Sequence, residues 1–442
     1  MRAHGLTAIR GRLLSFDADP SEAGISTPFT YVEDGLVTIR HGVITAVGEA
    51  SLLLRELPDG TPIDHFPDKL VMAGFIDLHI HYPQTRVIAS YGAQLLDWLQ
   101  KYTFVEEQKY RDPAHAGAGA DFFLDELLRN GTTTAAVYCS VHAQSVDAFF
   151  EASERRGTCM IAGKVMMDRN APPGLLDTPR SGHDGSEALL RKWHGRGRQL
   201  YAISPRFAIT STEEQLHMAG LLARRYPDVY VQTHLCETLD EIAMVKSLFP
   251  SDESYTAVYA RHGLLGPKTI LGHCIHLSDK EISMLGASGS IAAFCPTSNL
   301  FLGSGLFDMA RLRQARMPVN VGLATDVGGG TSYSMLRTAA EAYKVMQLQR
   351  QPFSALSAFD MMTRGNARLL GLADKIGRLA PGFDADIVVL GSRATPAMAH
   401  RMESIHDNLA EELFVLMTLG DDRSVAATYV AGRCVTASRF SV

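Results

Sequence analysis

The chain has 442 residues, a formal net charge of −6 and 46% hydrophobic residues, which is the ordinary composition of a soluble globular protein. A chain of this length can bury a large core, either in about three domains or in one long barrel. The charge provides no basic face for nucleic acid and no polybasic patch for a membrane, so the sequence disfavours both kinds of partner.

The cysteines and the N-terminal stretch indicate a cellular compartment. The six cysteines are scattered and include no C-x-x-C pair, which disfavours a disulfide framework and favours reduced thiols in the cytoplasm. Residues 1–20 carry charges throughout and lack the apolar core of a secretory signal. No apolar run is long enough to cross a bilayer. We therefore expect a cytoplasmic protein.

Both ends of the chain have the pattern of short antiparallel strands, in which apolar and polar residues alternate and Gly stands at the turns. Four stretches share this pattern: residues 7–17, 35–49, 377–391 and 424–438. Because the middle of the chain lacks it, we expect one small β domain that is assembled from both ends. Two separate β caps are the alternative.

The middle of the chain, about residues 71–377, alternates short apolar runs with longer amphipathic stretches, which is typical of βα units on a parallel sheet. Eight runs have the character of strands: residues 74–81, 132–139, 159–168, 199–207, 228–236, 269–274, 290–296 and 318–326. Eight units over about 300 residues predict an α/β fold of the (β/α)8 TIM-barrel type.

Several segments between these strands have recognisable boundaries. Residues 118–131 are expected to form a helix that stops at Gly131. Residues 211–228 are expected to form another helix, because Ser211 and Glu214 have capping-box spacing at its start. Residues 168–185 are rich in Pro and Gly and are expected to form a long surface loop.

The first expected barrel strand carries His79 and His81 near its C-terminal end. Side chains two apart in a strand point to the same face, so both imidazoles should converge on one point. With 16 His in the chain, an H-x-H pair arises by chance about half the time, so the pair by itself is weak evidence for a metal. A metal site requires further ligands elsewhere.

Other residues with suitable chemistry stand where later strands end, which is where barrels place catalytic residues. They are Arg206 and Phe207, His234 with Glu237 three residues on, His273, and Asp326 before a Gly-rich turn. Imidazole and carboxylate suit zinc or ferrous iron better than calcium or copper(I). A catalytic metal lowers the pKa of a bound water to ~7, and Glu237 could take and return protons.

Each of these residues also has a purely structural interpretation. His273 could be a hydrogen-bonded core histidine, Asp326 a turn former, and Glu237 a carboxylate near the start of the next helix. Lys164, inside an expected strand, could bridge a second metal if carbamylated or could be an ion-paired interior lysine. His142, His262 and His276 are interpreted as surface or loop residues.

The histidines and Asp326 together resemble the amidohydrolase superfamily, metal-dependent hydrolases on a (β/α)8 barrel. Many members carry a small β-sandwich domain built from both chain ends, which implies a sandwich from residues 1–70 and 378–442 around a catalytic barrel of residues 71–377. A closer resemblance, to the guanine deaminase family, is carried by six stretches: "HIHYPQ", "LLDWLQKYTF", "SPRFAIT", "THLCE", "CPTSNLFLGSGLFD" and "TDVGGGTSYSMLRT".

This resemblance implies hydrolysis of guanine to xanthine and ammonia, with a metal-bound hydroxide attacking C2. It implies one Zn²⁺ per subunit, with Fe²⁺ as the alternative, and it assigns the ligands to His79, His81, His234 and Asp326. His273 is implied to lie beside the metal and its water, where it could ligate the metal or orient the water. A homodimer is also implied.

The resemblance likewise implies roles in proton transfer and substrate binding. Asp326 would accept the proton of the water, and Glu237 would carry a proton to N3 and then to the leaving amine. The substrate contacts are assigned to Gln84 and Arg206 as hydrogen-bonding groups, Phe207 against the ring and Trp98 along the pocket wall. Deaminases of this superfamily resemble a one-metal design, which disfavours a bridging Lys164.

Three positions depart from the family pattern: Ala73 and Val105 replace Pro, and Phe294 replaces a His before "CPTSN". Phe294 is the one nearest to the expected site, so it bears on the side chains behind the ligands. The H-x-E and P-C-x-x-C motifs of the other zinc deaminase design are absent. The alternatives are a related amidohydrolase acting on 8-oxoguanine, a pterin or a triazine, and a non-enzymatic scaffold.

Overall fold

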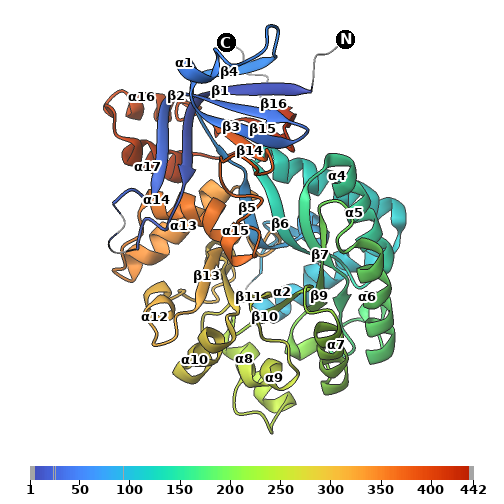
Figure 1. The fold of residues 1–442 in the computed structure, drawn as a ribbon. Helices are drawn as coiled ribbons and strands as arrows, with labels where there is room; N and C mark the ends of the chain where they lie inside the picture. Colours follow the sequence, from blue (N-terminus) through green and yellow to red (C-terminus); the bar gives the residue numbers. More distant parts are fainter. Residues whose placement is uncertain (1–4, 23, 25, 93, 438–442) are drawn as a thin grey trace.

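The computed structural model describes residues 5–22, 24, 26–92 and 94–437. Residue 438, the last of the C-terminal stretch expected to be extended, lies outside the described residues, as do residues 1–4 of the expected N-terminal part. Figure 1 shows two parts, a twisted sheet above and a ring of strands surrounded by helices below. No helix in the described ranges combines the length and the apolar character needed to cross a bilayer.

The lower part is the expected barrel. Its strands are β5 (Phe75–His81), β6 (Thr132–Tyr138), β7 (Cys159–Gly163), β9 (Gln199–Pro205), β10 (Tyr230–Leu235), β11 (Thr269–His273), β12 (Ile291–Phe294) and β13 (Asn320–Leu323). They pair in chain order, each parallel to the next, and the short β8 (Val165–Met166) pairs with β9. All eight strands lie within the predicted runs, so the fold class is confirmed.

Hydrogen bonds at the seam between β13 and β5 hold the two ends of the ring together. The backbone N–H of Asp326 donates to the carbonyl of His79 at 2.8 Å. The amide Nδ2 of Asn366 donates to the carbonyls of Ile76 and Leu323 at 2.7 and 2.9 Å. The first and last strands therefore end side by side, which brings together residues almost 250 positions apart.

Apolar side chains fill the space within the barrel below the strand ends. This cluster includes Ile76, Leu78, Ile161, Ile270 and Ile291, all at most 2% exposed. The pairing of β5 with β6 changes register between Asp77 and Ile80, and such bulges re-aim the side chains that follow. The polar residues at the barrel mouth thus stand on a rigid apolar base.

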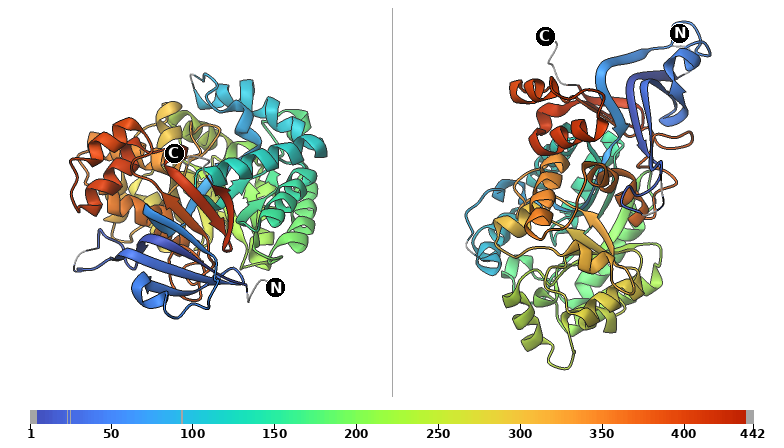
Figure 2. Two further views of the ribbon diagram at one scale, coloured as in Figure 1. Left: turned by 90° about the horizontal axis from the view of Figure 1, so that it is seen from above. Right: turned by 90° about the vertical axis from the view of Figure 1, so that its left-hand side faces the viewer.

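Helices cover the outside of the barrel (Figures 1 and 2). They are α4 (Pro113–Arg129), α5 (Ala143–Arg156), α6 (Pro179–Trp193), α7 (Glu213–Arg225), α8 (Leu239–Leu248), α9 (Tyr255–Arg261), α10 (Asp279–Ser288), α11 (Pro296–Phe301), α12 (Met309–Arg313), α13 (Met335–Leu348), α14 (Ala355–Asp360) and α15 (Asn366–Leu369). A helical segment made of α2 (Leu95–Trp98), a π-helical turn (Leu99–Thr103) and α3 (Phe104–Glu107) follows β5.

Two local predictions about these segments are wrong and one is confirmed. The N-cap of α7 is Thr212, whose hydroxyl accepts the N–H of Gln215, while Ser211 donates its hydroxyl to the Gln215 side chain. Residues 168–185 are not one loop, because α6 starts at Pro179, a residue favoured in the first helical turn. Gly131 follows α4 with a φ of +79°, as expected for a helix stop.

The upper part is one seven-stranded sheet made from both ends of the chain. Its order is β16 (Arg433–Ala437), β15 (Val425–Val430), β14 (Ile387–Leu390), β4 (Ile63–Ala73), β1 (Leu6–Phe16), β2 (Phe29–Arg40) and β3 (Val43–Glu49). The antiparallel pairing of β14 with β4 joins the two ends, which confirms a single β domain and excludes two separate caps. The helices α16 (Pro396–Met402) and α17 (Leu409–Leu419) lie between β14 and β15 in the chain, and α1 (Ala50–Leu53) follows β3.

The sheet passes directly into the first barrel strand. Only Gly74 separates β4 from β5, and its N–H donates to the carbonyl of Asp386 at 2.9 Å. Arg198, beside β9 of the barrel, bonds the buried carboxylate of Asp386. These contacts hold the strand that carries His79 and His81 against the sheet domain.

Candidate active site

A cavity opens at the C-terminal ends of the barrel strands, the face at which such barrels place catalytic residues. Most of its lining residues stand at the strand ends or in the helical segment after β5. The lining consists of His81, Gln84, Leu95, Trp98, Leu99, Arg206, Phe207, His234, Glu237, His273, Leu302, Asp326 and Gly329. Every residue expected at the site lines this cavity except His79, which is fully buried behind it.

Four side chains direct their nitrogen or oxygen atoms toward one point. The Nε2 atom of His81 lies 3.2 Å from that of His79 and 3.3 Å from that of His234. The Oδ1 atom of Asp326 lies 3.3 Å from the Nε2 atoms of both His79 and His81. Tetrahedral zinc with bonds of about 2.0–2.1 Å separates its ligands by roughly 3.3 Å. The spacing of these atoms therefore fits a single divalent cation.

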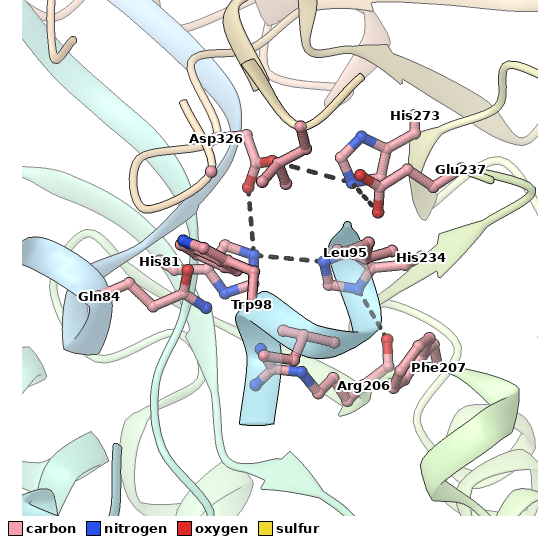
Figure 3. Close-up of a pocket in the computed structure, with 13 residues that line it drawn as sticks. His81, Gln84, Leu95, Trp98, Arg206, Phe207, His234, Glu237, His273 and Asp326 are labelled. Atoms are coloured by element: carbon pink, nitrogen blue, oxygen red, sulfur yellow. Dashed lines mark hydrogen bonds and ion pairs between the residues drawn. The ribbon is translucent and has the colours of Figure 1, made fainter. Parts of the chain in front are cut away.

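His273 stands at the edge of this group. Its Nε2 atom lies 3.3 Å from Glu237 and 3.8 Å from Asp326, and it forms a second candidate metal-binding group with His79 and Asp326. Figure 3 shows His273 and Glu237 on one side of Asp326, with His81 and His234 on another. Both interpretations of His273, as a ligand or as a group that orients water, are compatible with this position.

Hydrogen bonds on the far side of two rings determine which nitrogen faces the cavity. Nδ1 of His234 lies 2.8 Å from the backbone carbonyl of Arg206. Since a carbonyl only accepts, Nδ1 carries the proton and Nε2 presents a lone pair. Nδ1 of His273 lies 2.9 Å from Oδ1 of Asn299. Because an amide oxygen accepts, Nδ1 of His273 also carries the proton and its Nε2 presents a lone pair.

Burial keeps the imidazoles of His81 and His234 neutral, as metal ligands must be. It lowers the pKa of His81 to about 3, and it lowers the pKa of His234 well below its usual value, with neighbouring rings adding to the effect. Burial acts to raise the pKa of Asp326, but hydrogen bonds with His79 and His81 outweigh it and hold the pKa well below its usual range. Neutral rings beside a carboxylate are the donor set expected for zinc or ferrous iron.

The backbone near these groups adopts conformations that side chains rarely tolerate. Cys236, His273 and Asp326 have φ angles of 51°, 71° and 50°, in the left-handed region that is unusual outside glycine. Such strain gathers at functional sites, where the surrounding structure holds it in place. Gly272 is needed for packing, because a Cβ there would lie 2.6 Å from Cε1 of His79.

Glu237 is buried and hydrogen-bonded on both its side chain and its backbone. Burial raises its pKa to about 8, and the charge of Asp326 adds to the rise. The hydroxyl of Ser304 donates to Oε1 of Glu237 at 2.8 Å, and the carboxylate of Glu241 accepts the backbone N–H of Glu237 at 2.7 Å. His276, a partly exposed loop residue as predicted, lies 2.7 Å from the carbonyl of Ser304 and so supports this arrangement.

Gln84 and Arg206 share a partner that sequence reasoning missed, the carboxylate of Glu107. Nε2 of Gln84 donates to Oε1 of Glu107 at 3.0 Å. Nη1 of Arg206 donates to both carboxylate oxygens, at 2.9 and 2.8 Å. The only available signal was that Glu107 lies just after the "LLDWLQKYTF" stretch. Sequence reasoning also missed Ser304 and Asn299, although both lie within "CPTSNLFLGSGLFD".

Two residues that raised questions in the sequence lie away from the cavity. Lys164 is buried and pairs with Asp177, as in the interpretation of an ion-paired interior lysine. Phe294 stacks on Phe307, with ring centroids 4.5 Å apart and an interplanar angle of 14°. Its ring therefore belongs to the hydrophobic core around the barrel.

Comparison with known proteins decides the family. The model of the amidohydrolase family matches residues 70–435, which is most of the chain. The chain belongs to the amidohydrolase family. Amidohydrolases are metal-dependent enzymes, and the His and Asp group at the barrel mouth provides the donors that such a metal requires.

Similar amidohydrolases carry a common name. The chain is 48% identical over 435 residues to "Guanine deaminase" of Escherichia coli (strain K12), covering 98% of each sequence. The solved structure titled "E. coli Guanine Deaminase" superposes with a TM-score of 0.95 and covers 98% of this chain and 100% of that one. A guanine deaminase from C. acetobutylicum "with bound guanine in the active site" is 30% identical, with a TM-score of 0.84 and coverages of 98% and 100%.

Proposed function

We propose that this protein is a guanine deaminase that hydrolyses guanine to xanthine and ammonia. The observation that carries the proposal is one cavity in which a metal-binding group and Glu237 face the hydrogen-bonding pair Gln84 and Arg206. Guanine deaminases of high identity and a related structure with bound guanine support the assignment. The reaction places this enzyme in guanine catabolism, a part of purine metabolism.

We propose that His79, His81, His234 and Asp326 hold one Zn²⁺ ion per subunit, with Fe²⁺ as the chemical alternative. When bound, the cation supplies Lewis acidity that lowers the pKa of a water to ~7. Nδ1 of His79 is fully buried and has no hydrogen-bond partner, whereas its Nε2 lies 3.2 Å from Nε2 of His81. Nε2 is therefore the atom of His79 that would bind the metal. His273 borders the same space and orients a water or completes the ligand set.

Proton transfer falls to the two carboxylates that face this space. Asp326 accepts a proton from the attacking water. Glu237, whose raised pKa of about 8 favours the protonated acid near neutral pH, gives its proton to N3 of the purine. It then takes the second proton of the water from the new C2 hydroxyl and passes it to the amine as the C2–N bond breaks. Ser304 and His273 hold the carboxyl group of Glu237 in reach of the substrate. The proton held by Asp326 then restores Glu237, so the net result is that the two protons of the water are delivered to N3 and to ammonia.

The opposite side of the cavity receives the purine. Arg206 presents N–H groups to the O6 carbonyl, and Gln84 bonds the neighbouring ring edge. Phe207 packs against the flat ring, and Trp98, held by its Nε1–H bond to the Ser90 carbonyl at 3.3 Å, forms part of the wall. In this proposal C2 of guanine faces His81 and Asp326, and its carbonyl faces Arg206.

The direct test is an assay on protein of measured metal content. Guanine should be converted to xanthine with one ammonia released per turnover, and 8-oxoguanine, a pterin and a triazine should be poorer substrates. Metal-replete protein that leaves guanine unchanged would refute the function. Faster turnover of another ring in the panel would assign the protein to the related amidohydrolase instead.

The remaining parts of the proposal rest on the family resemblance. We propose that the enzyme acts as a homodimer, which light scattering on the purified protein would measure directly. We also propose a cytoplasmic location, in keeping with cysteines that are all unpaired in the described part of the chain. Cell fractionation with an antibody to the native protein tests this second point.

A further inference from the structure

Glu107 is an acid buried behind the two side chains proposed to bind the purine. It is the last residue of α3, its side chain is 1% exposed, and it touches both Gln84 and Arg206. A buried carboxylate is costly unless charged and polar partners satisfy it, so these contacts need a reason beyond packing.

Its contact with Gln84 determines how the amide of that residue is turned. A carboxylate accepts hydrogen bonds and has no proton to give while it is paired with a guanidinium. The NH2 group of Gln84 must therefore face Glu107, as the 3.0 Å contact from Nε2 shows. Oε1 is then left on the side of the loop that follows Asp326, where a Cβ on Gly328 would lie 2.1 Å from it. Gln84 consequently offers an acceptor.

The contact of Glu107 with Arg206 determines which N–H groups of the guanidinium remain available to a ligand in the cavity. Nη1 is occupied by both carboxylate oxygens, and the guanidinium carbon lies 5.3 Å from the centre of the Phe104 ring. Arg206 has no acceptor atom, so whatever it offers the cavity is an N–H donor. Because Gln84 and Arg206 bond the same oxygen of Glu107, an acceptor and a donor stand next to each other.

We propose that Glu107 is a positioning residue that sets the hydrogen-bond polarity of the purine pocket. The inference rests on the proposed function and deepens it. An acceptor beside a donor complements a ring N–H beside a carbonyl, which is the N1–H and C6=O edge of guanine. A 6-aminopurine presents the reverse order, an unprotonated N1 beside an amino group. Glu107 would thus exclude 6-aminopurines without touching the substrate.

The neighbouring acid, Glu106, supplies a matched control. It is also buried, but its carboxylate bonds Lys109 and His115 at 2.6 and 3.2 Å. It therefore faces away from Gln84 and Arg206. A change from acid to amide at position 106 alters a buried carboxylate of the same helix and leaves the purine pocket as it is.

The test compares two unreactive purines as competitive inhibitors of guanine deamination, hypoxanthine with the N1–H and C6=O edge and adenine with the reverse edge. The wild-type enzyme should bind hypoxanthine much more tightly. In Glu107→Gln, whose amide can either donate or accept, the ratio of the two inhibition constants should fall by about tenfold or more, the scale of a hydrogen bond to a charged group. Glu106→Gln should keep the wild-type ratio.

A second variant covers the case in which Glu107→Gln does not fold. The exchange Gln84→Glu with Glu107→Gln retains one carboxylate in the cluster and places an acceptor toward the purine, so it should keep the preference for hypoxanthine. An unchanged ratio in Glu107→Gln, no preference in the exchange variant, or adenine binding as tightly as hypoxanthine to the wild type would overturn the inference. Wild-type protein inactive on guanine would instead refute the proposed function.

Discussion

Arg206 and His234 connect the two halves of the cavity through one hydrogen bond. The backbone carbonyl of Arg206 lies 2.8 Å from Nδ1 of His234, while the side chain of Arg206 lies beside Glu107, in the half of the cavity proposed to receive the purine. The position of a ring proposed to bind the metal and that of a guanidinium proposed to bind the substrate are thus set by the same residue. A displacement of this strand end would disturb metal and purine together.

Glu237→Gln should abolish most of the activity without loss of metal. The amide keeps the shape of the side chain but cannot pass protons, and general acid–base catalysis contributes about 10²–10⁴-fold. Steady-state rates on guanine and elemental analysis measure the two quantities. The exposed Glu253→Gln, whose carboxylate is 63% accessible, serves as the control. Retention of more than about a tenth of the wild-type rate would contradict the role of Glu237.

Ser304→Ala should lower kcat by about 10- to 100-fold, because a hydrogen bond to a charged or strongly polarised group is worth about 1.5–3 kcal/mol. Its hydroxyl holds Oε1 of Glu237 at 2.8 Å, so the loss should appear in kcat more than in KM. Ser283→Ala, which removes an exposed hydroxyl bonded to the Asp279 carbonyl, should change neither constant. Equal effects of the two variants would show that Ser304 does not position the acid.

Removal of the metal should inactivate the enzyme and lower its thermal stability. A ligand that binds only the folded state at 1,000 times its Kd stabilises it by about 4 kcal/mol. Chelation followed by addition of zinc should therefore lower and then restore both Tm and activity. His81→Ala should fail to regain metal, whereas His400→Ala, with a side chain 87% exposed, should behave like the wild type. Full activity in metal-free protein would contradict the proposal.

Arg198→Ala should destabilise the fold through the sheet domain. It leaves the carboxylate of Asp386, 3% exposed, without its charged partner, and breaking such a buried pair costs about 3–5 kcal/mol. Arg196→Ala, which removes a half-exposed pair with Glu154, should cost about 0–1 kcal/mol. Urea unfolding followed by circular dichroism compares the two variants. Similar midpoints would mean that the Arg198 pair contributes little to stability.

Much of the architecture could be predicted from local sequence patterns. Buried parallel strands are short, nearly continuous apolar runs, and each of the eight runs contains a strand of the barrel. His79, His81, His234 and Asp326 stand at strand ends, so the barrel itself brings them to one cavity. Their catalytic and ligand roles remain predictions. The start of α7 was misplaced because Ser211 and Thr212 are both good N-caps, and only tertiary hydrogen bonds select between them.

By itself the sequence determined the class of fold, the two-ended β domain and the identity of the residues at the barrel mouth. Those features follow from the periodicity of apolar residues and from chemistry concentrated at predictable points of the chain. Only the tertiary structure placed Glu107 against Gln84 and Arg206, and Ser304 against Glu237. These partners lie 23 to 99 positions apart, and no local pattern encodes a contact that forms only when separate loops close over the same buried space.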